Sequence, residues 1–182
     1  FWPVFIYDSV HGYDFLAQAM IREGSLHNSI FDINYPLYGM RSLYPPLVPI
    51  SFSTSLLFGH ETSKIVTVWF YLSNFVVFYS FLKKYATHLA ASLFSLFLVI
   101  TPEFAAFSSL SSPNPACMFY SAMGMLSLYI WFKDGVRSYF NIGTLCIVLA
   151  LWTRTEAVMF FITGGALILL NTIKTKKYSL LI

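Results

Sequence analysis

Charged side chains are scarce in this chain of 182 residues, since only 10% are Asp, Glu, Lys or Arg while 57% are hydrophobic. A soluble domain typically carries about 25% charged residues, so the surface of an ordinary globular protein is excluded. A large core in a soluble protein is the alternative, but the successive apolar runs are each about as long as a bilayer requires. The runs are continuous and do not alternate residue by residue, which favours membrane helices over a membrane β-barrel.

Cysteine is rare as well, and the positive and negative charges nearly balance. The two cysteines, Cys117 and Cys146, both lie within apolar runs, which argues against a disulfide scaffold, and their spacing indicates no metal site. The net charge of +3 is too small and too scattered to indicate a nucleic-acid partner. The chain begins without Met and stops within an apolar stretch, so we expect it to be an internal fragment.

We interpret the chain as one all-α integral membrane domain, a polytopic helical bundle that is incomplete at both ends. Residues 1–7 are the end of a first span, rich in the aromatic side chains typical of the membrane surface. Residues 8–64 form a polar loop that contains two short helices, at residues 10–21 and 47–58. The rest of the chain, 65–182, contains about five spans, over residues 65–82, 89–100, 113–132, 139–152 and 157–170.

Local signals predict where several of these helices end and how they pack. Gly24 is expected to end the first short helix, because glycine readily adopts the left-handed conformation there. Pro102 is expected to stop the second long run, and Ser112 is suited to cap the helix after it. In the last run, Gly164 and Gly165 predict close packing on a neighbouring helix.

The apolar run at residues 47–58 is the ambiguous one. It is short of the roughly twenty residues that span a bilayer, and it contains three serines and one threonine. A run of this length more often lies along the membrane surface or re-enters than crosses. We therefore expect it to be an interfacial helix.

The basic residues predict the orientation of the spans. If residues 47–58 do not cross and the five later runs do, seven of the eleven Lys and Arg residues share one side, which the positive-inside rule makes cytoplasmic. These are Lys83, Lys84, Lys133, Arg137, Lys174, Lys176 and Lys177. Seven of the eight acids then lie on the extracytoplasmic side, with only Asp134 inside. If residues 47–58 did cross, the polar opening would instead share the side of these bases.

Five short motifs follow one another along the chain: Asp8 directly after the first span, GYDF at 12–15, YPPL at 44–47, FGHE at 58–61 and TRTEA at 153–157. In their order and spacing they resemble the GT-C membrane glycosyltransferases, above all the branch of protein mannosyltransferases and aminoarabinose transferases. The resemblance covers essentially the whole chain.

The resemblance implies transfer of a sugar from a polyprenyl-phosphate donor to an acceptor on the extracytoplasmic face of the membrane. The family's first outer loop lies on the membrane and carries a catalytic carboxylate, which by position falls on Asp8, with Asp14 as the second choice. This carboxylate would act as general base on the acceptor. The family usually has a further aspartate where this chain has Asn114. Because an amide cannot take a proton or hold a cation well, we expect no metal cofactor.

Four further residues are predicted to contact substrate: Tyr44, Asn114, Arg154 and Glu156. Charges beside apolar spans are costly, so they are usually functional or paired. The planar guanidinium of Arg154 is suited to the phosphate of a lipid-borne donor. The alternative is that Arg154 and Glu156 only pair with each other at a helix break, and that Tyr44 only stiffens the exit of the loop.

Structural roles also compete with the catalytic ones. Asp8 is equally suited to cap the helix that follows it, and Asp14 can lie on an exposed helix face. At the level of the whole chain, two alternatives to a transferase remain: a transporter-like membrane protein, and a non-catalytic relative that binds a lipid. Asn114 in place of an aspartate leaves the second of these open.

Overall fold

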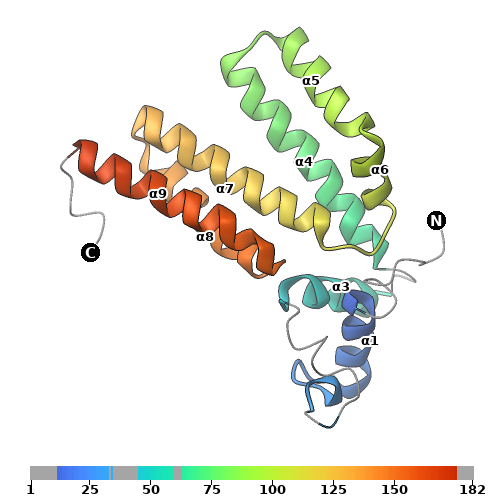
Figure 1. Ribbon diagram of the computed structural model, residues 1–182. Helices are drawn as coiled ribbons and strands as arrows, with labels where there is room; N and C mark the ends of the chain where they lie inside the picture. The colour runs from blue at the N-terminus through green and yellow to red at the C-terminus, as the bar shows by residue number, and fades with distance from the viewer. Residues whose placement is uncertain (1–11, 33, 35–44, 60–62, 176–182) are drawn as a thin grey trace.

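The computed structural model describes residues 12–32, 34, 45–59 and 63–175, and every regular element within these ranges is helical. Figure 1 shows long helices side by side, with two short helices below them. In chain order the elements are α1 (Asp14–Glu23), the 3-10 turn η2 (Ser29–Phe31), α3 (Leu47–Leu57), α4 (Lys64–Tyr85), α5 (His88–Ile100), α6 (Pro102–Ser108), α7 (Asn114–Asp134), α8 (Arg137–Leu151), the 3-10 turn η3 (Thr155–Ala157) and α9 (Val158–Thr175).

Among the described residues, three helical stretches are long and apolar enough to cross a membrane: Lys64–Tyr85, Asn114–Asp134 and Thr155–Lys174. Helices α5 and α6 make a fourth if the bent pair is one span. Helix α8 has 15 residues, or about 22 Å at 1.5 Å per residue, whereas the hydrocarbon core is about 30 Å thick. Length and composition therefore support a membrane protein, while the expected five crossings stay a prediction.

The bend between α5 and α6 comes from Pro102, as expected. The two helices meet at 66°, because proline has no N–H to continue the hydrogen bonds of α5. Carbonyl groups at the end of α5 then need other donors, and that of Val99 accepts a hydrogen bond from the Tyr71 hydroxyl at 2.7 Å. The chain continues beyond the bend as α6, a helix that the sequence did not predict.

Close packing of α7, α8 and α9 depends on glycine. A Cβ atom on Gly143 of α8 would lie 2.8 Å from the Leu128 side chain of α7, and one on Gly124 of α7 would meet α8 at the same distance. Gly164 of α9 also faces Leu128, with 3.1 Å to the added atom, whereas Gly165 has nothing within 4 Å. The prediction of close packing is confirmed for Gly164 and wrong for Gly165, and Gly124 and Gly143 were missed.

The outer faces of the long helices are apolar, and some of their buried side chains are polar. Trp69, Phe97 and Ile162 are 65%, 60% and 60% exposed. By contrast Asn74 of α4 is 3% exposed, and its amide donates a hydrogen bond to the carbonyl of Pro115 in α7 at 3.0 Å. Apolar outer surfaces with polar contacts between helices suit lipid surroundings.

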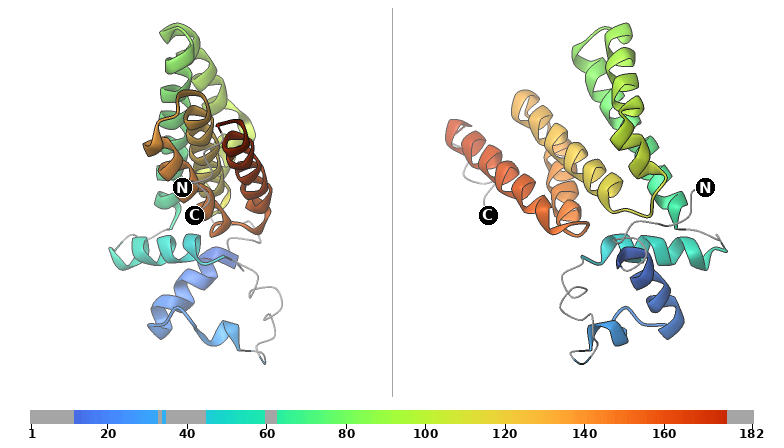
Figure 2. Two further views of the ribbon diagram at one scale, coloured as in Figure 1. Left: turned by 90° about the vertical axis from the view of Figure 1, so that its left-hand side faces the viewer. Right: turned by 45° about the vertical axis from the view of Figure 1, so that its right-hand side comes forward.

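Helices α1 and α3 form a layer across one end of the long helices (Figure 2). A small apolar core joins the layer to the bundle, in which Tyr13, Ala17, Val48 and Phe52 pack together with Ala116 of α7. Helix α3 has 11 residues and runs across the helix ends, as expected of a helix that lies along the membrane surface. The layer therefore brings the described part of the polar opening to this end of the bundle.

Helix α1 covers Asp14–Glu23 and therefore ends two residues later than the predicted 10–21. Residues 10 and 11 lie outside the described part of the chain. Gly24 ends the helix with φ at 62°, and its N–H donates to the Ile21 carbonyl, so the role predicted for this glycine is confirmed.

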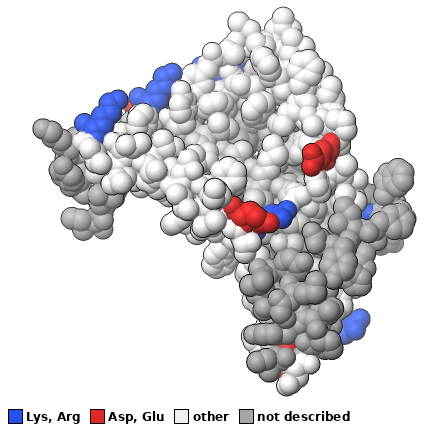
Figure 3. Space-filling model, viewed as in Figure 1, with Lys and Arg blue, Asp and Glu red and all other residues white. Residues whose placement is uncertain are grey.

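Basic side chains gather at the end of the bundle away from α1 and α3. Figure 3 shows them along the upper margin, over the ends of α7 and α9, with a mostly uncharged body below. There Lys84 of α4 forms an ion pair with Asp134 of α7, and the Lys133 ammonium lies 4.4 Å from the centre of the Tyr85 ring. Of the seven bases predicted to lie together, the five that are described share this end, while the side of the membrane stays a prediction. They are Lys83, Lys84, Lys133, Arg137 and Lys174.

Candidate functional site

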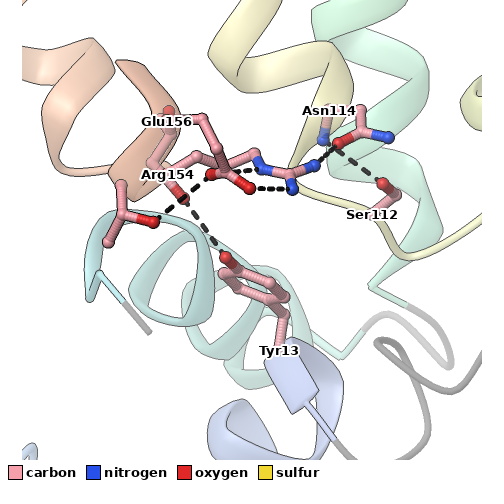
Figure 4. A network of polar contacts seen from close by, with 7 residues as sticks. Tyr13, Ser112, Asn114, Arg154 and Glu156 are labelled. Atoms are coloured by element: carbon pink, nitrogen blue, oxygen red, sulfur yellow. Dashed lines mark hydrogen bonds and ion pairs between the residues drawn. The ribbon is translucent and has the colours of Figure 1, made fainter. Parts of the chain in front are cut away.

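The break between α8 and α9 lies at the end of the bundle that the layer of α1 and α3 covers, and we call this the polar end. A helix leaves its last carbonyl groups without partners. Here the C-cap carbonyl of α8 and the next carbonyl group accept hydrogen bonds from the layer of α1 and α3, which we call the outer layer. The Leu47 N–H at the start of α3 donates to the Trp152 carbonyl at 3.1 Å, and the Tyr13 hydroxyl donates to the Thr153 carbonyl at 3.4 Å (Figure 4). The outer layer is therefore tied to the segment that carries Arg154.

Arg154 is held by acceptors from two sides. Its Nε and Nη2 donate to the two carboxylate oxygens of Glu156 at 3.1 and 2.6 Å, and its Nη1 donates to the side-chain oxygen of Asn114 (Figure 4). The hydrogen bonds with Glu156 raise the pKa of Arg154 above its ordinary value, so the guanidinium stays charged. The pairing that was the structural alternative to substrate binding is thus present, and it also includes Asn114.

Asn114 owes its position to the start of α7. The Ser112 hydroxyl accepts a hydrogen bond from the Asn114 N–H at 3.2 Å, which satisfies one of the free donors at a helix N-terminus. Ser112 thus accepts the hydrogen bond expected of it, but it does so at the position before the N-cap, since Pro113 takes the N-cap position of α7. The cap places the amide of Asn114 beside the guanidinium of Arg154, although 40 residues separate them in sequence.

A groove of about 350 Å³ opens beside this cluster, and we call it the Arg154 groove. It lies between the starts of α7 and α9, with a polar rim at one end and mainly apolar walls. Its lining is Asn114, Cys117, Met118, Ser121, Arg154, Glu156, Ala157 and Phe160. The groove can accept an anionic head at the guanidinium and an apolar group along the helices.

Sequence reasoning missed the walls of the Arg154 groove, although a signal was present. Cys117, Met118 and Ser121 follow Asn114 by three, four and seven residues, so they share one face of α7. Phe160 of α9 follows Glu156 by four residues, across the join between the 3-10 turn η3 and α9. The spacing identifies one wall on each helix, but not that the two walls face each other.

Asp14 belongs to a neighbouring network and does not line the Arg154 groove. Its carboxylate accepts hydrogen bonds from the Gln18 amide at 2.9 Å and from the Ser63 hydroxyl at 2.5 Å. The Ser63 hydroxyl is also 2.7 Å from that of Ser111. Because Ser63 has one hydrogen and donates it to Asp14, Ser111 must be the donor in the second bond. Asp14 is thus half-buried, and it is held by a neighbour in its own helix and by Ser63, which lies 49 residues away in sequence. It is not free on an exposed face.

The structure brings together three of the six predicted site residues, namely Asn114, Arg154 and Glu156. It places Asp14 in the adjacent network, while Asp8 and Tyr44 lie outside the described residues. Within the described ranges no three His, Cys, Asp or Glu side chains come together as metal ligands would. The expectation that the site works without a metal stays a prediction.

No protein-family model matches this chain, and no curated protein or solved structure matches it either.

Proposed function

We propose that this chain is part of a membrane glycosyltransferase that moves a sugar from a polyprenyl-phosphate donor to an acceptor on the extracytoplasmic face. One observation carries the proposal: a guanidinium lies at the rim of a groove whose remaining walls are mainly apolar, beside the described part of the polar opening. A donor with a charged phosphate and a hydrocarbon tail needs both surfaces at once. The order of the GT-C-like motifs supports the same class of reaction.

In the proposed reaction, a carboxylate takes the proton from an acceptor hydroxyl as its oxygen attacks the anomeric carbon of the sugar. The bond between that carbon and the phosphate oxygen breaks, and polyprenyl phosphate leaves. Asp8 or Asp14 acts as the base. Arg154 binds the phosphate, whose negative charge increases as the bond breaks, while the Asn114 amide is suited to a hydroxyl or phosphate oxygen. Tyr44 and Glu156 are the remaining proposed substrate contacts, and Glu156 faces the sugar or the acceptor, because a carboxylate repels the phosphate itself.

Asp14 has the geometry that a positioned base requires. Hydrogen bonds from Gln18 and Ser63 orient its carboxylate, and its neighbour Tyr13 contacts the segment before Arg154. Through Tyr13, helix α1 with the proposed base is thereby connected to the α8–α9 break, which carries the proposed phosphate-binding group. The proposal involves no metal, because the site has an amide where a second carboxylate would hold one.

The proposal is tested with Asp8→Asn and Asp14→Asn in the full-length protein, assayed for sugar transfer from several polyprenyl-phosphate donors. Loss of the general base lowers the rate by about 10²–10⁴-fold, so one of the two variants should lose transfer to that degree. Asp134→Asn, at the opposite end of the bundle, is the matched control and should retain activity. Unchanged turnover in both Asp8→Asn and Asp14→Asn would remove the base assignment.

A non-catalytic lipid-binding relative is the second candidate. It is favoured by the contacts of Arg154, whose side chain is already paired with Glu156 and Asn114. In that case wild-type protein would bind polyprenyl phosphates without transferring sugar from any donor.

A further inference from the structure

Glu156 is the closest anion to Arg154, and its position suggests a second role for it. Its carboxylate contacts the guanidinium through two N–H groups, the two-pronged arrangement that phosphate oxygens also adopt with arginine. We propose that Glu156 is a displaceable internal ligand, which closes the anion site at Arg154 until the phosphate of a prenyl lipid replaces it. This inference rests on the proposed function, since it concerns the same site.

The contact with Glu156 lies at the surface, where a competing anion can reach it. Among the described residues, the one side chain besides Arg154 that donates to this carboxylate is that of Thr155, through a long hydrogen bond of 3.4 Å. The Glu156 side chain is 65% exposed and that of Arg154 is 30% exposed, and ion pairs this accessible contribute little to stability. The two residues are only two positions apart, so a change of side-chain rotamer is enough to separate them. Displacement of Glu156 therefore requires no movement of a helix.

Arg154 keeps the capacity to bind a ligand when Glu156 leaves. A guanidinium has five N–H groups, and three of them make the described hydrogen bonds. The bond to Asn114 does not depend on Glu156, so it holds Arg154 at the rim while the other N–H groups become available. Asn114 is thus a positioning residue for the open site.

The walls of the Arg154 groove indicate which anion replaces Glu156. Met118, Ala157 and Phe160 supply apolar surface directly beyond the guanidinium, and Phe160 is 42% exposed on the outer face of α9. A tail in the groove therefore has a continuous apolar path from the rim to the face that is expected to meet lipid. A phosphate with a prenyl tail matches both parts, whereas free phosphate matches only the rim.

The test measures binding and does not depend on sugar transfer. Full-length protein in phosphatidylcholine nanodiscs is titrated with farnesyl phosphate, with farnesol as the same tail without charge, and with inorganic phosphate as the charge without a tail. A site that is occupied by its own side chain binds more weakly by the fraction of time that it is open. For an exposed pair, Glu156→Gln should therefore tighten farnesyl phosphate binding by about fivefold, and Glu156→Ala by at least as much.

Three controls show whether the effect is specific to Glu156, requires Arg154 and needs the prenyl tail. Glu103→Gln removes an equally charged, exposed acid that does not contact Arg154, and it should leave the affinity unchanged. Arg154→Gln should remove the preference for farnesyl phosphate over farnesol, with or without Glu156→Gln. Inorganic phosphate should bind at least about tenfold more weakly than farnesyl phosphate, because it leaves the apolar walls unfilled.

Two results would overturn the proposal. If both Glu156 variants bind farnesyl phosphate no better than wild type, Glu156 is not a competing ligand, and sugar transfer by the wild type would still stand. If no variant prefers farnesyl phosphate to farnesol and to inorganic phosphate, the Arg154 groove is not a site for a prenyl phosphate. Failure of the transferase proposal is read separately, from product formation by wild type and the Asp8 and Asp14 variants.

Discussion

The two ends of the helical bundle are both polar, but they are built differently. At the basic end the contacts are exposed: Lys84 and Asp134 pair with side chains 38% and 32% exposed, and Lys133 lies over a tyrosine ring. The opposite end also has an exposed pair, Arg154 with Glu156, but beside it lies a buried network. There Ser63 and Ser111 are 1% exposed each, and Ser63 binds both Ser111 and Asp14.

The two ends therefore suit different tasks: exposed charges can orient the chain in a membrane, and buried hydrogen bonds can hold side chains in a defined arrangement. Exposed charges can be exchanged or moved with little loss, and they need only be positive to favour one side of a membrane. Buried hydrogen bonds between distant segments require a particular geometry, and they are costly when one partner is lost. We infer that the end with the outer layer is the one whose arrangement matters for function.

The largest effect is expected where the outer layer joins the bundle. Phe52 is fully buried in the core that α1 and α3 share with α7, and Phe52→Ala should lower the free energy of unfolding by about 3–5 kcal/mol. Equilibrium unfolding in mixed micelles measures the change. Phe58→Ala is the matched control, because that ring is 81% exposed and should contribute little. Equal effects of the two substitutions would show that the layer is not held by its core.

The sequence predicted most of the helices because the physical signal for them is local. Apolar runs of sufficient length, Pro102 and Gly24 each act on their own segment. The runs form helices, and the two residues end α5 and α1 as expected. Packing was harder to predict, since Gly164 and Gly165 are adjacent and alike in sequence. Which of them meets Leu128 depends on the rotation of α9, and the sequence of α9 alone does not determine that angle.

The site was predictable to the same limited degree. Arg154 and Glu156 lie within one motif, so their pairing was foreseen as an alternative. The contact of Arg154 with Asn114 joins residues 40 positions apart, and that of Ser63 with Ser111 joins residues 48 positions apart. Such contacts depend on how α4, α7 and the α8–α9 break are placed relative to one another. That placement comes from tertiary packing, which short motifs do not encode.

A smaller effect is expected from the hydrogen bonds of the polar end itself. Ser63→Ala removes the donor to Asp14 and the acceptor of Ser111 together, and it should lower the free energy of unfolding by about 1–3 kcal/mol. Ser73→Ala, in the helix that begins directly after Ser63, is the control, because the Ser73 hydroxyl donates to the Trp69 carbonyl of its own helix and its loss should be nearly neutral. If the two variants unfold alike, the buried network does not stabilise this end.

The smallest effect is expected at the basic end. A large effect there would contradict the difference between the two ends. Asp134→Asn removes the ion pair with Lys84, but both side chains remain in contact with water, which screens the attraction and solvates the remaining charge. The free energy of unfolding should fall by less than about 1 kcal/mol, and the difference should shrink further as salt is added. Unfolding of wild type and variant at low and high ionic strength measures both. A loss as large as that from Ser63→Ala, independent of salt, would mean that the two ends are built alike after all.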